Sequence, residues 1–333
     1  MSSSSAIQLI DVDRQPGRPP MMQVDQPADA PAWATEHRDG LRALVAVHGA
    51  ILVRGLGLHD GAEIAMVFRN LSNSLMTERE AFAPRRIYAD GVYSSATWPA
   101  NQPMCMHHEL SYALEVPSLM LFACVTPPSQ GGATGVADSP SVLRALPAEL
   151  TERLRRDGWL LTRNYNDDIG ASIGDAFGTD DPSAVEAYCR ANAIDFEWQP
   201  DGGLRTQQRR AAVVPHPVTG EPCWFNQIAF LNEWTIAPEI REYLVDMYGE
   251  DGLPFNTRFG NGDPITEDTV MLLNGVYEAN TAREPWRAGD LMLVDNIRTA
   301  HSREAYEGPR EVLVGMADAV RLDNSPTGEV TAA

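Results

Sequence analysis

The stretch Met106-His107-His108-Glu109-Leu110-Ser111-Tyr112 decides how the fold is interpreted, together with the distant segment Val294-Asp295-Asn296-Ile297-Arg298-Thr299-Ala300-His301. On a β-strand, residues i and i+2 point to the same face, so His107 and Glu109 can converge on one metal ion. With His301 as a further ligand, two imidazoles and one carboxylate would hold one face of an iron ion and leave the other face open to a co-substrate and O2. This ligand set is typical of non-heme Fe(II) oxygenases.

The context of His301 strengthens this interpretation, since a His-x-Glu triplet alone is common and a single histidine is more often a hydrogen-bonded side chain than a ligand. An apolar run at residues 290–296 precedes His301 and is typical of a buried strand that ends in a polar turn. A second strand-like run follows at residues 308–316 and carries Arg310.

Arg310 indicates an anion site. A guanidinium in an otherwise apolar strand is costly unless it meets an anion, and arginine binds a carboxylate through two parallel hydrogen bonds. A dicarboxylic co-substrate such as 2-oxoglutarate would offer one group to the metal and the other to Arg310. The alternative is an arginine at a strand edge that extends into water.

With these residues the chain resembles the taurine dioxygenase/clavaminate synthase superfamily of Fe(II)- and 2-oxoglutarate-dependent oxygenases, over roughly residues 49–318. Within the superfamily it is most similar to the branch of the syringomycin-type aspartyl hydroxylases of peptide-antibiotic pathways. The segments that carry the closer resemblance are 107–112, 163–165, 177–181, 216–221, 224–227 and 301–310.

The resemblance implies a ligand set and a fold. It implies that His107, Glu109 and His301 bind iron, and that Arg310 and Thr134 bind the distal carboxylate of 2-oxoglutarate; for Thr134 the alternative is a turn threonine after a glycine pair. The implied fold is α+β, with a double-stranded β-helix (jelly roll) core, flanking helices and a lid insertion at about residues 162–227. Short mixed strands between helices agree with that fold.

Many relatives have Asn between the first His and the acid, where this chain has His108, which could be a substrate contact or a false ligand. Two further positions narrow the expected reaction and substrate. Related halogenases replace the acidic ligand with a small residue so that chloride can bind iron, and Glu109 blocks that route, which favours hydroxylation. The taurine-specific member has a further arginine four residues after the co-substrate arginine, where this chain has Val314, so a sulfonate substrate is not expected.

The expected reaction is hydroxylation of an unactivated C–H bond, at the β-carbon, of an amino acid that is free or tethered to a peptidyl carrier protein in nonribosomal peptide (antibiotic) biosynthesis. Desaturation or epoxidation at the same iron centre, and a non-catalytic jelly-roll scaffold, are the alternatives. For Trp224 a core position and for Arg303 a surface position compete with a role at the substrate. The candidate substrate contacts are His108, Ser111, Trp224, Asn226 and Arg303.

Composition excludes some partners. The 333 residues carry 46 acidic and 26 basic side chains, a net charge of -20, which disfavours binding to nucleic acid or to an anionic membrane. Carrier proteins are usually acidic too, so docking to one would require a local basic patch. Arg205, Arg209 and Arg210 could form one, although a solvated loop is the favoured interpretation of this cluster.

The cysteines and the N-terminus predict a cytoplasmic enzyme. Cys105, Cys124, Cys189 and Cys223 are widely spaced and include no Cys-x-x-Cys pair, so neither a zinc site nor a disulfide framework is expected. The chain has no apolar stretch of about 18 residues and no cationic-then-apolar signal pattern.

The chain is expected to form one oxygenase domain at residues 31–323. A mobile Ser- and Pro-rich segment at 1–30, with a possible short strand at 6–12, precedes the domain, and a mobile tail at 324–333 follows it. Periodicity predicts helices at 31–47, 62–74, 139–157, 182–192, 238–248 and 266–281, and further strands at 50–54, 118–125, 135–138, 195–199 and 211–215.

Overall fold

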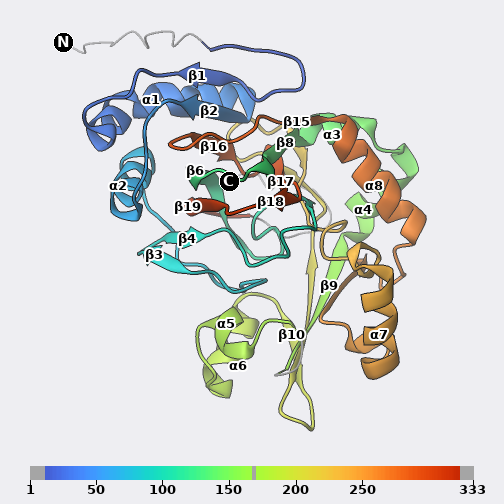
Figure 1. The fold of residues 1–333 in the computed structure, drawn as a ribbon. Coiled ribbons are helices and arrows are strands. Elements are labelled where there is room, and N and C mark those ends of the chain that lie inside the picture. The colour runs from blue at the N-terminus through green and yellow to red at the C-terminus, as the bar shows by residue number, and fades with distance from the viewer. Residues whose placement is uncertain (1–11, 167–169, 323–333) are drawn as a thin grey trace, which may run out of the picture.

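The computed structural model describes residues 12–166 and 170–322, and its centre is a pair of β-sheets (Figure 1). In spatial order, the larger sheet contains β1 (Met21–Gln23), β2 (Ala50–Arg54), β16 (Leu291–Asp295), β6 (Glu115–Thr126), β19 (Glu311–Arg321), β4 (Val92–Ser94) and β3 (Ile87–Ala89). The smaller sheet contains β15 (Thr281–Ala282), β8 (Thr134–Asp138), β17 (Thr299–Arg303) and β5 (Met104–His107).

Further strands and the helices surround this pair. A third sheet contains β10 (Asp195–Trp198), β11 (Leu204–Arg210), β9 (Trp159–Tyr165) and β14 (Phe255–Phe259). Two strand pairs complete the β-structure, β12 (Val213–Pro215) with β13 (Pro222–Trp224), and β7 (Gln130–Gly131) with β18 (Tyr306–Glu307). The helices are α1 (Ala30–His48), α2 (Gly61–Leu71), α3 (Ser139–Ala145), α4 (Ala148–Asp157), α5 (Ile173–Phe177), α6 (Pro182–Ala191), α7 (Pro238–Tyr248) and α8 (Glu267–Ala279), with short 3-10 turns at Glu233–Thr235 and Glu250–Gly252.

Both faces of the central strands of the larger sheet are buried. Because successive side chains of a strand point to opposite faces, the sequences of these strands are almost continuously apolar. On β6, Leu119 and Leu121 pack in a cluster with the buried faces of α1 and α2. Met120 and Phe122 point the other way, into a cluster that includes Val136 of the smaller sheet. The two sheets therefore enclose a common core between them.

This arrangement is the jelly roll expected from the sequence, with helices outside it, and the α+β fold class is confirmed. The helices predicted at 31–47, 182–192 and 238–248 are present as α1, α6 and α7. The prediction of one continuous helix at 139–157 is wrong. The segment is divided into α3 and α4 at Leu146 and Pro147, because proline lacks the N–H that a continuous helix needs.

The segment at 162–227 contains β10, β11, α5 and α6 (Figure 1). It has a small core of its own. Tyr165, Phe177, Val185, Cys189 and Leu204 are buried together there. Its role as a lid stays a prediction, as does the extent of a single domain.

The start of the chain needs a correction. Within the segment expected to be mobile at residues 1–30, β1 pairs in parallel with β2, and Met21 lies opposite Leu52 at the edge of the larger sheet. The possible strand at 6–12 lies almost wholly outside the described residues, and the tail at 324–333 lies outside them.

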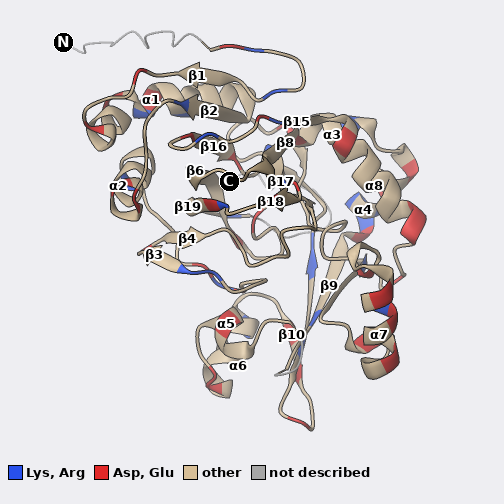
Figure 2. Cartoon of the chain, viewed as in Figure 1, with Lys and Arg blue, Asp and Glu red and all other residues tan. Residues whose placement is uncertain are grey.

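Acidic side chains are distributed over the outer helices, for example on α7 and α8 (Figure 2). Within the described part of the chain, no helix has both the length and the apolar character needed to cross a membrane.

Leu121 tests the two-sided packing of β6. Its side chain is fully buried, so we expect Leu121→Ala to lower the free energy of unfolding by about 2–5 kcal/mol, because it removes apolar contacts and leaves a cavity. Urea unfolding monitored by circular dichroism measures this change. Val218→Ala is the control, since Val218 is 85% exposed and its loss should change stability by less than about 0.5 kcal/mol. Equal effects of the two substitutions would contradict the packing described.

Candidate active site

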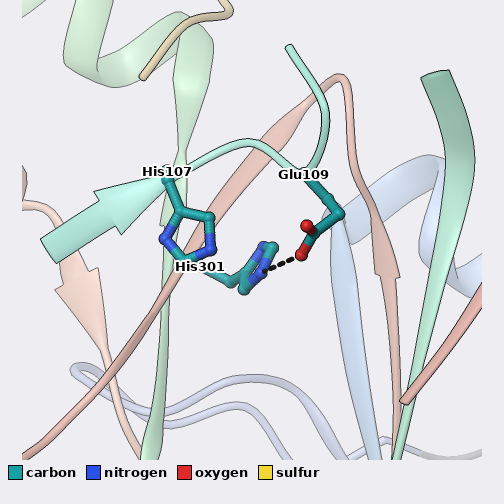
Figure 3. A group of neighbouring side chains, drawn as sticks. All are labelled: His107, Glu109 and His301. Carbon is teal, nitrogen blue, oxygen red and sulfur yellow. Dashed lines mark ion pairs between the residues drawn. The ribbon is translucent and has the colours of Figure 1, made fainter. Parts of the chain in front are cut away.

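His107, Glu109 and His301 lie together in one buried cavity (Figure 3). His107 is the last residue of β5, and His301 lies directly opposite it on β17 in the antiparallel pairing. One nitrogen or oxygen atom from each of the three side chains lies within 4.8 Å of the other two. The sequence-predicted metal ligands are therefore brought within reach of one ion.

Glu109 reaches the site in a different way from the one expected. The strand was predicted to supply both His107 and Glu109, but β5 ends at His107 and Glu109 lies in the turn that follows. The next residue, Leu110, has a positive φ of 55°, which belongs to a turn and not to a strand. Strand alternation alone does not place this carboxylate.

Asn296 holds the turn in place. Its side-chain oxygen accepts a hydrogen bond from the backbone N–H of Glu109 (2.8 Å), and its amide donates to the carbonyl of Glu109 (2.9 Å) and to that of Pro117 (2.9 Å). Asn296 is fully buried and directly follows β16. The sequence shows it only as part of a polar turn, so this positioning role was missed.

The protonation states of His107 and Glu109 suit a divalent metal. His107 donates from Nδ1 to the carbonyl of Cys105 (2.8 Å), which leaves Nε2 unprotonated. Burial lowers the pKa of His107 to about 3, and the nearby His301 adds to the effect. Nδ1 of His301 is buried and has no hydrogen-bond partner among residues 12–166 and 170–322. Neutral imidazoles and an ionised carboxylate are the forms that bind a metal, so the donor set fits a ferrous ion.

Arg85 keeps Glu109 ionised, and the sequence did not indicate it. Its Nη2 donates to Oε1 of Glu109 (3.1 Å), and its Nε donates to Oε1 of Glu78 (3.0 Å). Burial alone would raise the pKa of Glu109, but Arg85, His301 and His107 hold this pKa well below its ordinary range. Arg85 lies in an irregular stretch, and only the tertiary fold brings it to the cavity.

Arg310 and Thr134, the residues expected to bind the co-substrate, line the same cavity. Arg310 directly precedes β19 and donates from Nε to the carbonyl of Gly132 (3.0 Å) and from Nη1 to Oγ of Ser95 (3.3 Å). Within the described part of the chain, no carboxylate forms an ion pair with Arg310. Burial, with Arg303 close by, lowers the pKa of its guanidinium to about 10.

Thr134 is the first residue of β8 and lies opposite Arg303 of β17. Its Oγ1 accepts a hydrogen bond from Nε1 of Trp286 (3.2 Å). The hydroxyl hydrogen of Thr134 therefore stays available to an acceptor in the cavity, as a carboxylate-binding role requires.

Four of the five candidate substrate contacts need correction. Arg303 does line the cavity, and its role at the substrate stays a prediction. Its Nη atoms donate to the carbonyls of Trp98, Pro99 and Gln102, and its buried Nε has no hydrogen-bond partner among the described residues. The other four do not line the cavity, because they lie in the interior beyond it; these are His108, Ser111, Trp224 and Asn226.

His108 and Asn226 show why these positions were wrong. His108 is fully buried and donates from Nδ1 to the carbonyl of Asn296 (2.6 Å), so it faces away from His107 and supports the turn. Asn226 donates to the carbonyl of Ala212 (3.1 Å) and thereby joins the two sides of the β12–β13 hairpin. Both side chains use their polar atoms to hold backbone.

The arginines considered as a basic patch do not gather on one surface. On β11, Arg210 is buried and donates to backbone carbonyls, including that of Tyr112 (2.6 Å), whereas Arg205 and Arg209 lie on the opposite face. Arg205 also lies 3.5 Å from a carboxylate oxygen of Asp251. The favoured interpretation of this cluster as a solvated loop is therefore wrong, because all three arginines lie on β11 and one of them is buried.

Comparison with known proteins agrees with the fold and identifies the family. Residues 14–317 match the model of the family described as taurine catabolism dioxygenase TauD, TfdA family. The dapdiamide synthesis protein DdaC of Enterobacter agglomerans is 32% identical over 272 residues, which cover 82% of this chain and 83% of that protein. A clavaminate synthase-like protein of Arabidopsis thaliana is 26% identical over 287 residues, 83% of each chain.

Solved structures with the same fold include that of PvcB from Pseudomonas aeruginosa. It has a TM-score of 0.56 at 16% identity and covers 96% of this chain and 97% of its own. A further PvcB structure, described as an Fe, α-ketoglutarate-dependent oxygenase from an isonitrile synthetic pathway, has a TM-score of 0.54 at 17% identity, with the same coverage.

The family match covers every residue that lines the cavity, from Arg85 to Val314. It confirms the class of enzyme and the cofactor set expected from the sequence, namely a dioxygenase that uses Fe(II), 2-oxoglutarate and O2. The chain belongs to the TauD/TfdA family of dioxygenases.

Proposed function

We propose that the chain hydroxylates an unactivated C–H bond, at the β-carbon, of an amino-acid-like substrate in the biosynthesis of a secondary metabolite. One observation carries the proposal, namely that three metal-binding side chains share a cavity with Arg310, a partly buried cation that no described carboxylate neutralises. A metal site beside an unpaired guanidinium suits a co-substrate that carries two carboxylates.

His107, Glu109 and His301 would hold the iron, and Arg310 and Thr134 would hold the distal carboxylate of 2-oxoglutarate. When bound, iron, 2-oxoglutarate and O2 supply the oxidising power, and the co-substrate leaves as succinate and CO2. The protein orients the reactants and excludes water from the cavity. Glu109 keeps the acidic ligand whose absence would admit chloride, which supports hydroxylation over halogenation.

The biosynthetic role is supported by two relatives, one named for dapdiamide synthesis and the other assigned to an isonitrile pathway. The substrate is a small molecule. The proposal includes both a free substrate and one that is tethered to a carrier protein. We place the enzyme in the cytoplasm, since all four cysteines are unpaired, as is usual for proteins of a reducing compartment.

A screen for succinate release tests the function as a whole. Free amino acids and aminoacyl groups loaded on a carrier protein are each supplied with Fe(II), 2-oxoglutarate and O2. We expect at least one substrate to raise succinate release above the uncoupled background and to gain the mass of one oxygen atom. A product that has lost two hydrogens would identify a desaturase, and no stimulation by any substrate of this class would contradict the proposal.

His301→Ala tests the metal site. We expect it to abolish both Fe(II) binding and succinate release, because two of the three ligands cannot hold the ion in the buried cavity. Metal binding is measured by anaerobic calorimetric titration. His59→Ala is the control, since His59 belongs to an exposed group with Asp60 and Glu63, the other described cluster that could hold an ion. Retained binding in His301→Ala and loss in His59→Ala would place the metal at the surface.

Arg310→Ala tests the co-substrate site. Loss of charge-assisted hydrogen bonds to a carboxylate should raise the 2-oxoglutarate concentration needed for half-maximal activity by about 10- to 100-fold. Iron affinity should change little, since Arg310 contacts none of the three ligands. Arg310→Lys should recover part of the loss, because it restores the charge without the paired geometry. An unchanged requirement for 2-oxoglutarate in Arg310→Ala would assign the carboxylate site to other residues.

A further inference from the structure

Arg85 is a buried cation in the wall of the cavity that holds the three metal-binding side chains. Its side chain is 8% exposed and lies between two carboxylates, those of Glu109 and Glu78. The Glu78 carboxylate is itself 9% exposed. The three charges form a short buried chain that begins at the metal site and ends at Glu78.

The two oxygens of Glu109 have different neighbours. Oε1 accepts the hydrogen bond from Nη2 of Arg85 at 3.1 Å, whereas Oε2 faces Nε2 of His301 at 3.6 Å. A hydrogen bond from a cationic donor to a carboxylate is among the stronger ones in proteins. Arg85 therefore occupies one oxygen and leaves the other directed at the histidines.

Backbone hydrogen bonds alone do not fix the side chain of Glu109, so its carboxylate needs a further restraint. Asn296 forms hydrogen bonds with both the N–H and the carbonyl of Glu109 and so fixes its backbone. The side chain of Glu109 still has several freely rotating bonds. A carboxylate can bind a metal with one oxygen or with both. Binding through both would take up a position that the co-substrate or O2 needs.

Glu78 fixes the direction of the guanidinium. It accepts from Nε of Arg85 at 3.0 Å, while Nη2 on the outer side of the fork reaches Glu109. Because the guanidinium is planar and rigid, anchoring Nε on one carboxylate determines where Nη2 points. With two carboxylates and one guanidinium, the cluster has a net charge of about −1 before a metal binds.

We propose that Arg85 is a positioning residue that holds Glu109 as a one-oxygen metal ligand and so keeps the remaining positions open for 2-oxoglutarate and O2. The inference rests on the proposed function, because it assumes that the three side chains bind iron. It adds a residue of the cavity wall that acts through Glu109.

Co²⁺ is a suitable probe, because its visible absorption reports the number and geometry of its ligands without turnover. The test compares the parent protein with Arg85→Lys, which keeps the charge, and with the double variant Arg85→Gln/Glu78→Gln, which keeps the net charge of the cluster and removes the hydrogen bond to Glu109. Arg86→Gln is the matched control, since Arg86 is the exposed neighbouring arginine and its guanidinium lies over the Tyr88 ring.

We expect Arg86→Gln to reproduce the parent spectrum. Both Arg85 variants should still bind Co²⁺ but with an altered visible band. They should also need about tenfold more 2-oxoglutarate to develop the visible absorption that appears with Fe(II) in the absence of oxygen, because the co-substrate would have to displace the second oxygen of Glu109. A shift in both readouts is not expected from a merely structural role.

Parent-like spectra and parent-like 2-oxoglutarate titrations in both Arg85 variants would overturn the proposal. Unfolding of both variants, while Arg86→Gln stays folded by circular dichroism, would also overturn it, since Arg85 would then serve the fold alone. Failure of the proposed function is distinguishable, because the parent protein itself would then give no Co²⁺ band.

Discussion

The antiparallel pairing of β5 with β17 is the constraint on which the site depends. It places His301 opposite His107, although the two histidines are far apart in the sequence. A shift of one residue would turn His301 to the other face of the sheet. Strand β17 also pairs with β8, where Arg303 lies opposite Thr134. The two pairings of β17 therefore place both histidines and the hydroxyl proposed to bind the co-substrate.

Three arginines line the cavity, and their partners give them different tasks. Arg85 is neutralised by two carboxylates, and Arg303 donates to three backbone carbonyls. Arg310 donates only to one carbonyl and one hydroxyl among its described neighbours. A buried cation without an anion is costly, and neither Arg303 nor Arg310 has a carboxylate partner among the described residues. The Nε of Arg303 is also without a hydrogen-bond partner there, so both arginines retain capacity for an anionic ligand.

Part of this site could be predicted from the sequence and part could not. The candidate metal ligands, which the structure brings together, could be proposed because their residue types and the strand-like context of His301 restrict the chemistry, and because the chain resembles a known superfamily. Asn296 and Arg85 escaped prediction, since their contacts with Glu109 depend on how distant turns meet. Among the substrate candidates, His108 and Asn226 lie outside the cavity and hydrogen-bond to backbone groups.

Although its neighbour β10 was predicted at 195–199, strand β11 was missed for a related reason. Its buried positions include Thr206, Gln208 and Arg210, which an apolar periodicity does not reveal. Gln208 and Arg210 both donate to the carbonyl of Tyr112, so hydrogen bonds to the core replace apolar contacts there. By contrast, β6 and β16 were predictable because both of their faces are buried and apolar.

A crystal structure with Fe(II) and 2-oxoglutarate, prepared without oxygen and recorded at the iron absorption edge, tests the central claim most directly. We expect one strong anomalous peak within bonding distance of His107, Glu109 and His301, with the distal carboxylate of 2-oxoglutarate hydrogen-bonded to Arg310. An iron peak at the exposed His59 cluster alone, or 2-oxoglutarate bound away from Arg310, would contradict this claim.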